Sequence, residues 1–357
     1  MDAIVDAFRA QARACEALGS PFTAALLDRA ADALAATAAP STGRLAQMLG
    51  GWHGDPQAAA LPLRFAAALH ALVLSDRAPA LAARFPPRSD AFDPISDWQC
   101  IEDEIVAHRP FFSAWLASAP QTNEVGRSTL LLAGYLTLAR RMGRPLQLME
   151  IGASAGLNQA WDRFRYRLGD TAWGDPRSPV VLAPRWEGPP PPVETPCPVA
   201  ARAACDLAPI GLDDPVQQLR LRAYVWPDQQ ARLARLDAAI GVARAAQVTV
   251  ERSDAADWLQ RRLARRATDA CAVVAHTIVW QYLPRETRQR IRALLAATGE
   301  RATPLAPLAW LRFEFVDRAG PPQLLLDCWP GLRGERLATA HPHGDWVRWE
   351  ARDAPPE

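Results

Sequence analysis

The sequence predicts an α/β protein, in which a helical N-terminal region precedes a mostly parallel sheet that ends in an antiparallel hairpin. Three observations lead to this fold class. Apolar residues recur at helical spacing before residue 145, a short apolar strand then meets a glycine-rich turn, and strands alternate with helices to the end. We expect a helical region over 1–120 and a sheet domain over 121–357.

The N-terminal region contains four stretches with clear helix signals. Ser20-Pro21 predicts a helix start, because serine is a capping residue and proline suits the first helical position. Apolar spacing predicts helices over 61–74 and 97–108. A fourth helix, over 123–141, should end at Gly143, because glycine readily adopts the left-handed conformation that closes a helix.

The remainder of the chain alternates between strand and helix patterns. Strands are expected at 146–151, 201–206, 248–251, 271–279 and 308–316, and two closing strands at 324–329 and 346–349. Helices are expected at 227–243, 256–265 and 285–297. This alternation predicts parallel strands with right-handed crossovers, and the short final connection predicts the antiparallel hairpin. A Pro-rich and Gly-rich segment near 170–198 is expected to form a long loop or insertion.

Composition narrows the classes of function. The net charge of +1 gives no overall attraction to nucleic acid or to an anionic membrane. All 40 basic residues are arginine, which excludes Schiff-base chemistry and a P-loop lysine. The six cysteines lack C-x-x-C spacing, which argues against a zinc ribbon and fits reduced cytosolic thiols.

The sequence also indicates where the protein works. The N-terminus lacks the pattern of a signal peptide, and no stretch approaches the ~20 apolar residues of a membrane span. We therefore expect a cytoplasmic protein with no membrane partner. The sequence indicates no oligomeric state.

The segment from Glu150 to Asn158, EIGASAGLN, joins the first expected strand to a helix-like stretch. Glycines at such a turn let the backbone pass close to a ligand, and free N–H groups at the following helix start attract anions. Ligands of open parallel sheets bind at the carboxyl ends of the strands. The segment therefore predicts a site for a nucleotide cofactor.

This turn resembles the first motif of class I S-adenosylmethionine-dependent methyltransferases, which reads acidic-x-Gly-x-Gly-x-Gly. Glu150, Gly152 and Gly156 match the motif, whereas Ser154 stands where the middle glycine usually is. The resemblance implies a Rossmann-like sheet. It also implies that S-adenosylmethionine is the cofactor and that it binds along Glu150 to Asn158.

Two other interpretations of the turn remain open. The same residues fit G-x-S-x-G, the nucleophile elbow of α/β-hydrolases, with Ser154 as nucleophile. Asp269 or Asp327, followed by His341 or His343, could complete a triad. That elbow follows several strands, whereas the region before this turn is expected to be helical. The turn could also serve close packing alone, but Glu150 and Asn158 are more polar than packing requires.

In the resembled fold, later strand ends complete the cofactor site. Asp206 ends the second strand, where an acidic residue holds the ribose hydroxyls, although it lies 56 residues after Glu150 instead of the usual ~20. Asp254 ends the third strand and is a candidate partner of the adenine amine. The alternative for both aspartates is a turn or helix cap.

The fourth strand ends in His276-Thr-Ile-Val-Trp-Gln-Tyr282, where the resembled fold places residues beside the transferred methyl group. His276 is a candidate general base, since its ordinary pKa suits that task. The alternative is a buried, hydrogen-bonded histidine. Tyr282 is a candidate substrate contact.

The whole chain also resembles a bacterial family of uncharacterised proteins through four segments, which are Gln121–Arg127, Glu150–Asn158, Tyr224–Gln229 and His341–Gly344. The first segment is densely polar, which makes Gln121, Asn123 and Arg127 candidate substrate contacts and Glu124 a second catalytic candidate. A helix cap with a surface salt bridge is the alternative for this cluster.

Two of these segments give weaker functional signals. Helix capping and packing explain Trp226-Pro-Asp228 fully. His341 and His343 are candidate substrate contacts, and their His-Pro-His spacing is insufficient to predict a metal site.

The sequence thus favours a methyltransferase that uses S-adenosylmethionine and acts on a small molecule whose identity the residues do not indicate. A non-catalytic cofactor-binding or regulatory module of the same fold is the alternative, which Ser154 and the long gap to Asp206 support. A serine hydrolase that uses Ser154 is the third hypothesis. No nucleic-acid partner is expected.

Overall fold

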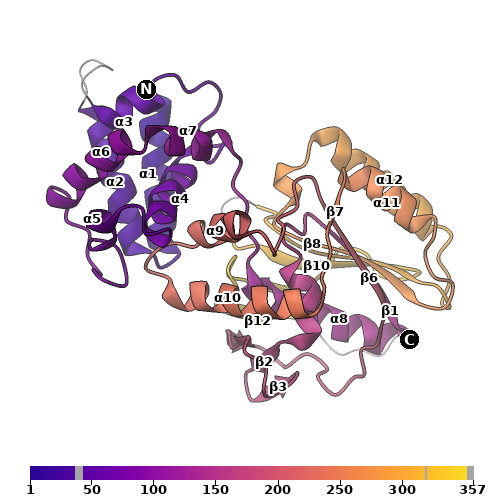
Figure 1. Ribbon diagram of the computed structural model, residues 1–357. Helices are drawn as coiled ribbons and strands as arrows, with labels where there is room; N and C mark the ends of the chain where they lie inside the picture. Colours follow the sequence, from indigo (N-terminus) through magenta and orange to yellow (C-terminus); the bar gives the residue numbers. More distant parts are fainter. Residues whose placement is uncertain (37–42, 318–319, 352–357) are drawn as a thin grey trace. The chain divides into compact units, whose positions relative to one another are not determined.

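The computed structural model describes residues 1–36, 43–317 and 320–351 (Figure 1). The chain forms two compact units: unit 1 contains 1–122 and 211–234, and unit 2 contains 123–210 and 235–357. The single boundary expected near residue 120 therefore misses the segment 211–234. That segment packs with the N-terminal helices, a return that no local pattern in the sequence indicates.

Unit 1 is helical, as the apolar spacing predicts. Its helices are α1 (Asp2–Ala17), α2 (Pro21–Ala35), α3 (Arg44–Leu49), α4 (Leu61–Leu74), α5 (Pro79–Ala82), α6 (Ser96–Ala107), α7 (Arg109–Ala117), α9 (Pro215–Ala223) and the start of α10 (Gln230–Ala245). Their apolar faces share a core that includes Phe8, Phe65 and Trp226. A smaller cluster packs Tyr224 against Ala71 of α4. Burial of Tyr224 and Trp226 explains why the segment 211–234 belongs to this unit.

The turn between α1 and α2 is closed by residues from the distant segment. Helix α2 begins at Pro21, but the expected cap by Ser20 is wrong, because that side chain makes no cap hydrogen bond. Asp228 accepts instead, from the Phe22 N–H over 3.0 Å and from the Ser20 hydroxyl over 2.5 Å. Gln229 Nε2 also donates to the Leu18 carbonyl over 2.9 Å. A carboxylate here satisfies an N–H that the helix leaves unpaired.

Unit 2 is built on a nine-stranded sheet with the order β5-β12-β11-β10-β9-β8-β1-β6-β7. Its strands are β1 (Leu146–Ile151), β5 (Arg185–Glu187), β6 (Val199–Asp206), β7 (Glu251–Arg252), β8 (Cys271–Thr277), β9 (Leu308–Glu314), β10 (Gln323–Trp329), β11 (Glu335–Ala340) and β12 (Trp346–Trp349). The five neighbours from β7 to β9 run parallel, and β9 to β12 run antiparallel. The expected α/β class, mostly parallel with antiparallel C-terminal strands, is confirmed.

Helices cover both faces of this sheet. Helices α11 (Ala255–Leu263) and α12 (Arg285–Gly299) lie side by side on one face (Figure 1), where Trp258 packs with Met149 and Trp310. Helix α8 (Ser128–Met142) covers the other face, where Gly134 meets Leu311, the neighbour of Trp310 in β9. Because successive strand residues point to opposite faces, Glu150 must point away from the face of Met149.

The C-terminal strands differ from the expected hairpin in one respect. β10 and β12 do not pair with each other, because β11 lies between them and pairs with both. The sequence of β11, ERLATA, lacks the apolar run that marks its neighbours. Among the described residues, no helix has the length and apolar character that a bilayer crossing needs.

The Pro-rich insertion is also more ordered than a loop. It contains β3 (Thr171–Trp173), β4 (Val181–Leu182) and β5, and β3 and β4 flank β2 (Arg165–Leu168) in a second small sheet. Trp161, Tyr166 and Trp173 pack their rings together with centroids 5.5–5.9 Å apart. These aromatic contacts give the insertion a local core that its Pro and Gly content conceals.

The contacts of Asp228 predict that this residue stabilises unit 1 from outside the N-terminal sequence. Asp228→Ala should lower the free energy of unfolding by about 2 kcal/mol, because it leaves the Phe22 N–H and the Ser20 hydroxyl without their acceptor. Ser20→Ala removes one contact and should cost about half as much. Urea denaturation measures both values, and a smaller cost for Asp228→Ala than for Ser20→Ala would contradict this assignment.

Candidate functional site

The strand order places a topological switch point at the centre of the sheet. Counted along the chain, the parallel strands lie in the order third, second, first, fourth, fifth, so the chain extends the sheet in one direction from β1 and then crosses to β8. Ligands of open α/β sheets bind outside the carboxyl ends of the strands at such a point. The turn from Gly152 to Gly156 follows β1 there.

The turn has an unusual backbone. Gly152, Ser154 and Gly156 have φ values of 66°, 53° and 73°. Ser154 therefore keeps the left-handed conformation that glycine favours, although a side chain there costs free energy. A side chain at the middle position of this turn thus coexists with a glycine-like backbone.

Asp206 binds this turn directly. The Ser154 N–H donates to Asp206 Oδ2 over 2.8 Å, and the Ala208 N–H donates to Oδ1 over 2.8 Å. The insertion does not separate Asp206 from the turn, because β6 pairs in parallel with β1 and sets Cys205 opposite Ile151. The carboxyl ends of both strands thus meet at the same edge of the sheet.

Packing also contributes to the choice of glycine in this turn. A Cβ at Gly152 would collide with the side chain of Val279, and one at Gly156 would lie 2.7 Å from the side chains of Val248 and Val250. The alternative of a packing turn therefore has direct support at both glycines. It does not explain the conformation of Ser154.

Glu150 lies below the turn with only 3 % of its surface exposed. Gln159 Nε2 donates to its Oε2 atom, and Gln159 Oε1 is buried without a hydrogen-bond partner among the described residues. Burial raises the pKa of Glu150 to about 7, although the Gln159 bond lowers it, and the charge of Asp206 raises it further. The site thus contains a carboxyl group that titrates near neutral pH and an unused acceptor beside it.

The stretch after the turn is not an α-helix. It forms η2 (Leu157–Arg163), a 3₁₀ helix interrupted at Ala160, so the expected helix with free N–H groups at its start is wrong. The Leu157 N–H already donates to Asn123 Oδ1 over 2.9 Å. Asn158 is buried and its Oδ1 accepts the Ser128 hydroxyl over 2.7 Å. Both asparagines therefore hold the turn in place.

Arg127 ties two further segments to this edge. Its Nε donates to the Pro342 carbonyl over 2.9 Å, and its Nη1 donates to the Thr277 carbonyl over 3.1 Å at the end of β8. Three of the four segments that carry the family resemblance, 121–127, 150–158 and 341–344, thus contribute residues to connected contacts in unit 2. Arg127 links main-chain atoms here, which a surface salt bridge would not do.

Glu124 is the acidic member of the same polar cluster and is 9 % exposed. Its Oε1 accepts the Gly126 N–H over 2.9 Å and lies 3.6 Å from Arg235 Nη2. The carboxylate therefore caps η1 (Val125–Arg127) and faces a partly buried cation. The alternative of a helix cap is correct for this contact, and the ion pair adds a charged group inside the unit.

The histidine segment packs on the polar cluster. A Cβ on Gly126 would collide with the His343 carbonyl. His341 Nδ1 accepts the His343 N–H over 3.2 Å and lies 3.2 Å from Asp345 Oδ2. Tyr282, in contrast, is 69 % exposed in η3 (Trp280–Tyr282). Gln121, the last of these candidates, belongs to unit 1.

His276 is completely buried in the sheet. Its Nδ1 lies 2.7 Å from Glu314 Oε1, and its Nε2 accepts the Trp310 indole N–H over 3.0 Å. The sheet register sets Ala275 opposite Glu150, so His276 points to the other face. This arrangement supports the alternative of a buried, hydrogen-bonded histidine, because neither ring nitrogen is available to a substrate.

The same contacts shape the loop at the end of β8. Glu314 Oε1 also accepts the N–H groups of Val279 and Trp280 over 3.0 and 3.2 Å. Ile278 precedes them with a φ of 49°, which is rare for a β-branched residue. Glu314 was not predicted as a site residue, because it lies far along the chain and gives no local signal.

Asp254 serves the end of the third strand as a helix cap. Its Oδ1 accepts the N–H groups of Ala256 and Asp257 over 2.9 and 3.1 Å at the start of α11. This contact is the capping alternative that the sequence left open. The adenine role of Asp254 has no support in this geometry.

The hydrolase interpretation of Ser154 meets two structural obstacles. Ser154 is 4 % exposed, and β1 is the first strand in the described part of the chain. A nucleophile elbow needs an accessible hydroxyl and follows several strands. Asp327, a candidate for its triad, forms a 2.5 Å ion pair with Arg312.

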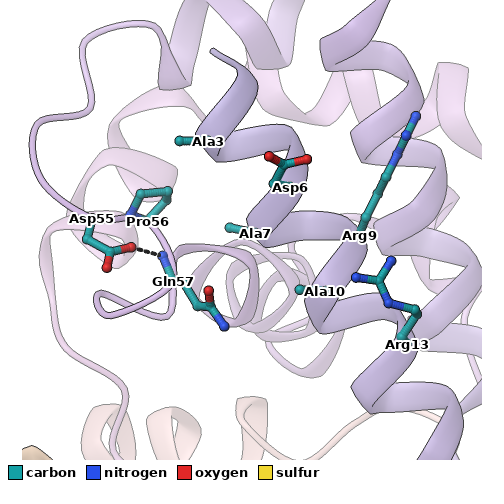
Figure 2. Close-up of a pocket in the computed structure, with 9 residues that line it drawn as sticks. All are labelled: Ala3, Asp6, Ala7, Arg9, Ala10, Arg13, Asp55, Pro56 and Gln57. Carbon is teal, nitrogen blue, oxygen red and sulfur yellow. Dashed lines mark hydrogen bonds between the residues drawn. The ribbon is translucent and has the colours of Figure 1, made fainter.

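Two cavities lie away from this edge of the sheet. One, of about 540 Å³, is in unit 1, where Figure 2 shows Asp6, Arg9 and Arg13 of α1 and the loop at 55–57 among the residues that line it. The other, of about 820 Å³, is lined by residues 143–145 before β1 and by the proline-rich segment at 190–196. It therefore lies at the amino end of β1. Within the described ranges, no cluster of three or more His, Cys, Asp or Glu side chains is arranged to hold a metal ion.

The left-handed backbone of Ser154 predicts that glycine at this position gives a more stable protein than alanine does. Ser154→Gly should unfold with a free energy about 1 kcal/mol higher than Ser154→Ala, because only glycine adopts this φ without strain. Both variants lose the hydroxyl, so their difference isolates the backbone. Ala153→Gly is the control and should destabilise by about 0.5–1 kcal/mol. Guanidinium denaturation measures all three, and a more stable Ser154→Ala would contradict the left-handed turn.

Glu150 should make stability depend on pH. Folding raises its pKa from 4.5 to about 7, so its contribution to stability is complete below pH 4.5 and is lost as the pH rises through 7. The difference in the free energy of unfolding between the wild type and Glu150→Gln should fall by up to roughly 3 kcal/mol over this range. The comparison with this variant is needed because burial lowers the pKa of His70 to about 4, which changes the stability of both proteins alike in the opposite direction. Glu300→Gln, at an exposed position, should keep the pH dependence of the wild type. Urea denaturation between pH 4.5 and 8 checks this, and equal slopes for all three proteins would contradict it.

Comparison with known proteins places the chain in a family. No curated protein and no solved structure matches it. The family described as "Uncharacterized protein conserved in bacteria (DUF2332)" matches residues 5–349, which include both units and all four of the segments that suggested a family. The chain belongs to this uncharacterised bacterial family.

Proposed function

We propose that this protein is a methyltransferase that binds S-adenosylmethionine at the carboxyl ends of β1 and β6 and acts on a small molecule. One observation carries the proposal. Ser154 keeps a glycine-like backbone at the switch point of the sheet, and the carboxylate of the neighbouring strand end, Asp206, binds its N–H. A turn of this shape beside an acidic strand end is what the methyltransferase resemblance implies.

The side chains at this edge fit parts of such a cofactor. Each oxygen of Asp206 accepts one N–H, which leaves further lone pairs that suit the hydroxyls of a ribose. Gln159 Oε1 is buried with no hydrogen-bond partner among the described residues and, with Glu150, suits a cationic amine. The valines that pack against Gly152 and Gly156 would have to yield some space.

When bound, S-adenosylmethionine supplies an electrophilic methyl group, so the protein has to hold and orient a nucleophile. Catalysis would rest mainly on positioning, which requires a rigid edge. Arg127 provides this rigidity by joining the end of β8 to the segment at 341–344. Glu124 is the carboxylate of this cluster that we assign to the substrate side, while His276 is excluded by its burial.

A non-catalytic cofactor-binding module is the second candidate. The observation in its favour is that His276 and Asp254, both predicted to serve the reaction or the adenine, form internal contacts instead. Such a module would bind the cofactor through Asp206 and lack transfer. Binding and transfer must therefore be measured separately.

Calorimetric titration with S-adenosylmethionine and S-adenosylhomocysteine tests the binding step. We expect a Kd of roughly micromolar size for the wild type. Asp206→Asn should weaken it about ten-fold or more, because one charged acceptor is lost. Asp175→Asn is the matched control, since Asp175 also accepts a main-chain N–H, that of Arg177, at an exposed turn, and it should bind as the wild type does.

The transfer step is tested by release of S-adenosylhomocysteine in the presence of small amines, thiols and hydroxylated acids. Release that Glu124→Gln abolishes supports the methyltransferase. Binding without release supports the module. No binding by the wild type overturns both, and labelling of Ser154 by a fluorophosphonate probe would then establish the hydrolase.

A further inference from the structure

Unit 1 contains a buried arginine in an unusual setting. Arg64, on α4, is 9 % exposed, and its guanidinium lies over the Trp52 ring, 5.5 Å from the centroid. Its Nε donates to the Ala59 carbonyl over 2.8 Å and its Nη1 to the Leu116 carbonyl over 2.7 Å. These bonds satisfy two groups and leave the positive charge uncompensated.

A second arginine shares this surrounding. Arg220, on α9, lies over the Trp115 ring, 5.4 Å from its centroid, and its Nη2 is buried with no hydrogen-bond partner among the described residues. The ring of Tyr224 packs on the same tryptophan at 6.0 Å. Tyr224 is 7 % exposed, and its buried hydroxyl lies near Arg220 but makes no hydrogen bond of good geometry within the described part of the chain.

The charges of this group are unbalanced. Neither Arg64 nor Arg220 forms an ion pair with an acidic residue in the ranges that the structure describes. Burial lowers the pKa of Arg64, Tyr224 opposes that shift, and the charge of Arg220 adds to it. Burial raises the pKa of Tyr224, and both arginines oppose that rise. A buried cation without a counter-charge is costly, and so is a buried donor without an acceptor.

We propose that Arg64, Arg220 and Tyr224 form a binding site for the oxyanion of a small molecule, a phosphate or a carboxylate. Arg220 Nη2 and the Tyr224 hydroxyl are the donors that such an anion would satisfy, and Arg64 adds a second positive charge. The Trp115 ring forms an aromatic wall beside them. The site lies entirely within unit 1, so the proposal does not depend on the proposed cofactor site in unit 2.

This assignment gives the third family segment a role. Tyr224 begins the sequence Tyr-Val-Trp-Pro-Asp-Gln, in which Trp226 joins the core and Asp228 caps α2. Those two contacts account for the packing of the segment. They do not account for a tyrosine hydroxyl buried beside two arginines, since phenylalanine would pack equally well.

Thermal unfolding of the full chain tests the site, with inorganic phosphate and acetate as separate probes and sodium chloride at matched ionic strength. We expect at least one oxyanion to raise the Tm of the wild type with concentration, since a ligand of the folded state stabilises it. Arg220→Gln should abolish the rise. Tyr224→Phe should raise the Kd about ten-fold through loss of one charge-assisted bond. Arg77→Gln, which removes an exposed arginine over the Phe111 ring, should respond as the wild type does.

Two further results would decide the case if Arg220→Gln fails to fold. Tyr224→Phe is nearly isosteric and should leave the Tm of the anion-free protein unchanged or raised, because the hydroxyl makes no hydrogen bond of good geometry with the described residues. A lowered Tm in that variant would overturn the proposal. So would a wild-type response that chloride reproduces, or no response to either oxyanion. A response to phosphate alone or to acetate alone identifies which group the site takes.

Discussion

The hydrogen bond from the Ser154 N–H to the Asp206 carboxylate is the contact on which the centre of unit 2 depends. It joins the ends of two adjacent parallel strands and fixes a turn that a serine would otherwise resist. Parallel strands direct their carboxyl ends to one edge, so a single carboxylate at the end of β6 reaches the turn after β1. The shape of this edge follows from that geometry and does not depend on the length of the chain between the two strands.

The fold class was predictable because it rests on periodicity. Apolar spacing locates most helices and strands of the described ranges, and the order of strand and helix implies the parallel sheet. Two features could not be predicted, because neither follows from the periodicity of its own sequence. Strand β11 has a mixed sequence and is held by its neighbours, and segment 211–234 returns to unit 1 through the burial of Tyr224 and Trp226. Both depend on long-range contacts that leave no local pattern.

The candidate site shows the same limit more sharply. The glycine turn and Asp206 could be placed at one edge from the motif and the strand order. The hydrogen bonds of each polar side chain could not be predicted, because their partners lie far away in sequence. His276 is occupied by Glu314 and Trp310, Asn123 by the N–H of Leu157, and Arg127 by two carbonyl groups. A polar residue in a motif can equally well support the backbone as contact a ligand.

The path of the chain between the two units has a consequence for synthesis. Trp226 belongs to the core of unit 1, and Asp228 accepts a hydrogen bond at the first turn of α2, so this unit lacks native contacts until residues 211–234 have left the ribosome. Strands β1 to β6 emerge before the missing segment does. Until segment 211–234 is made, part of the apolar surface of the N-terminal helices stays uncovered, while the first strands of the sheet are synthesised. Unit 1 is thus completed only after segment 211–234 has been made, although its first helices precede every strand of the sheet.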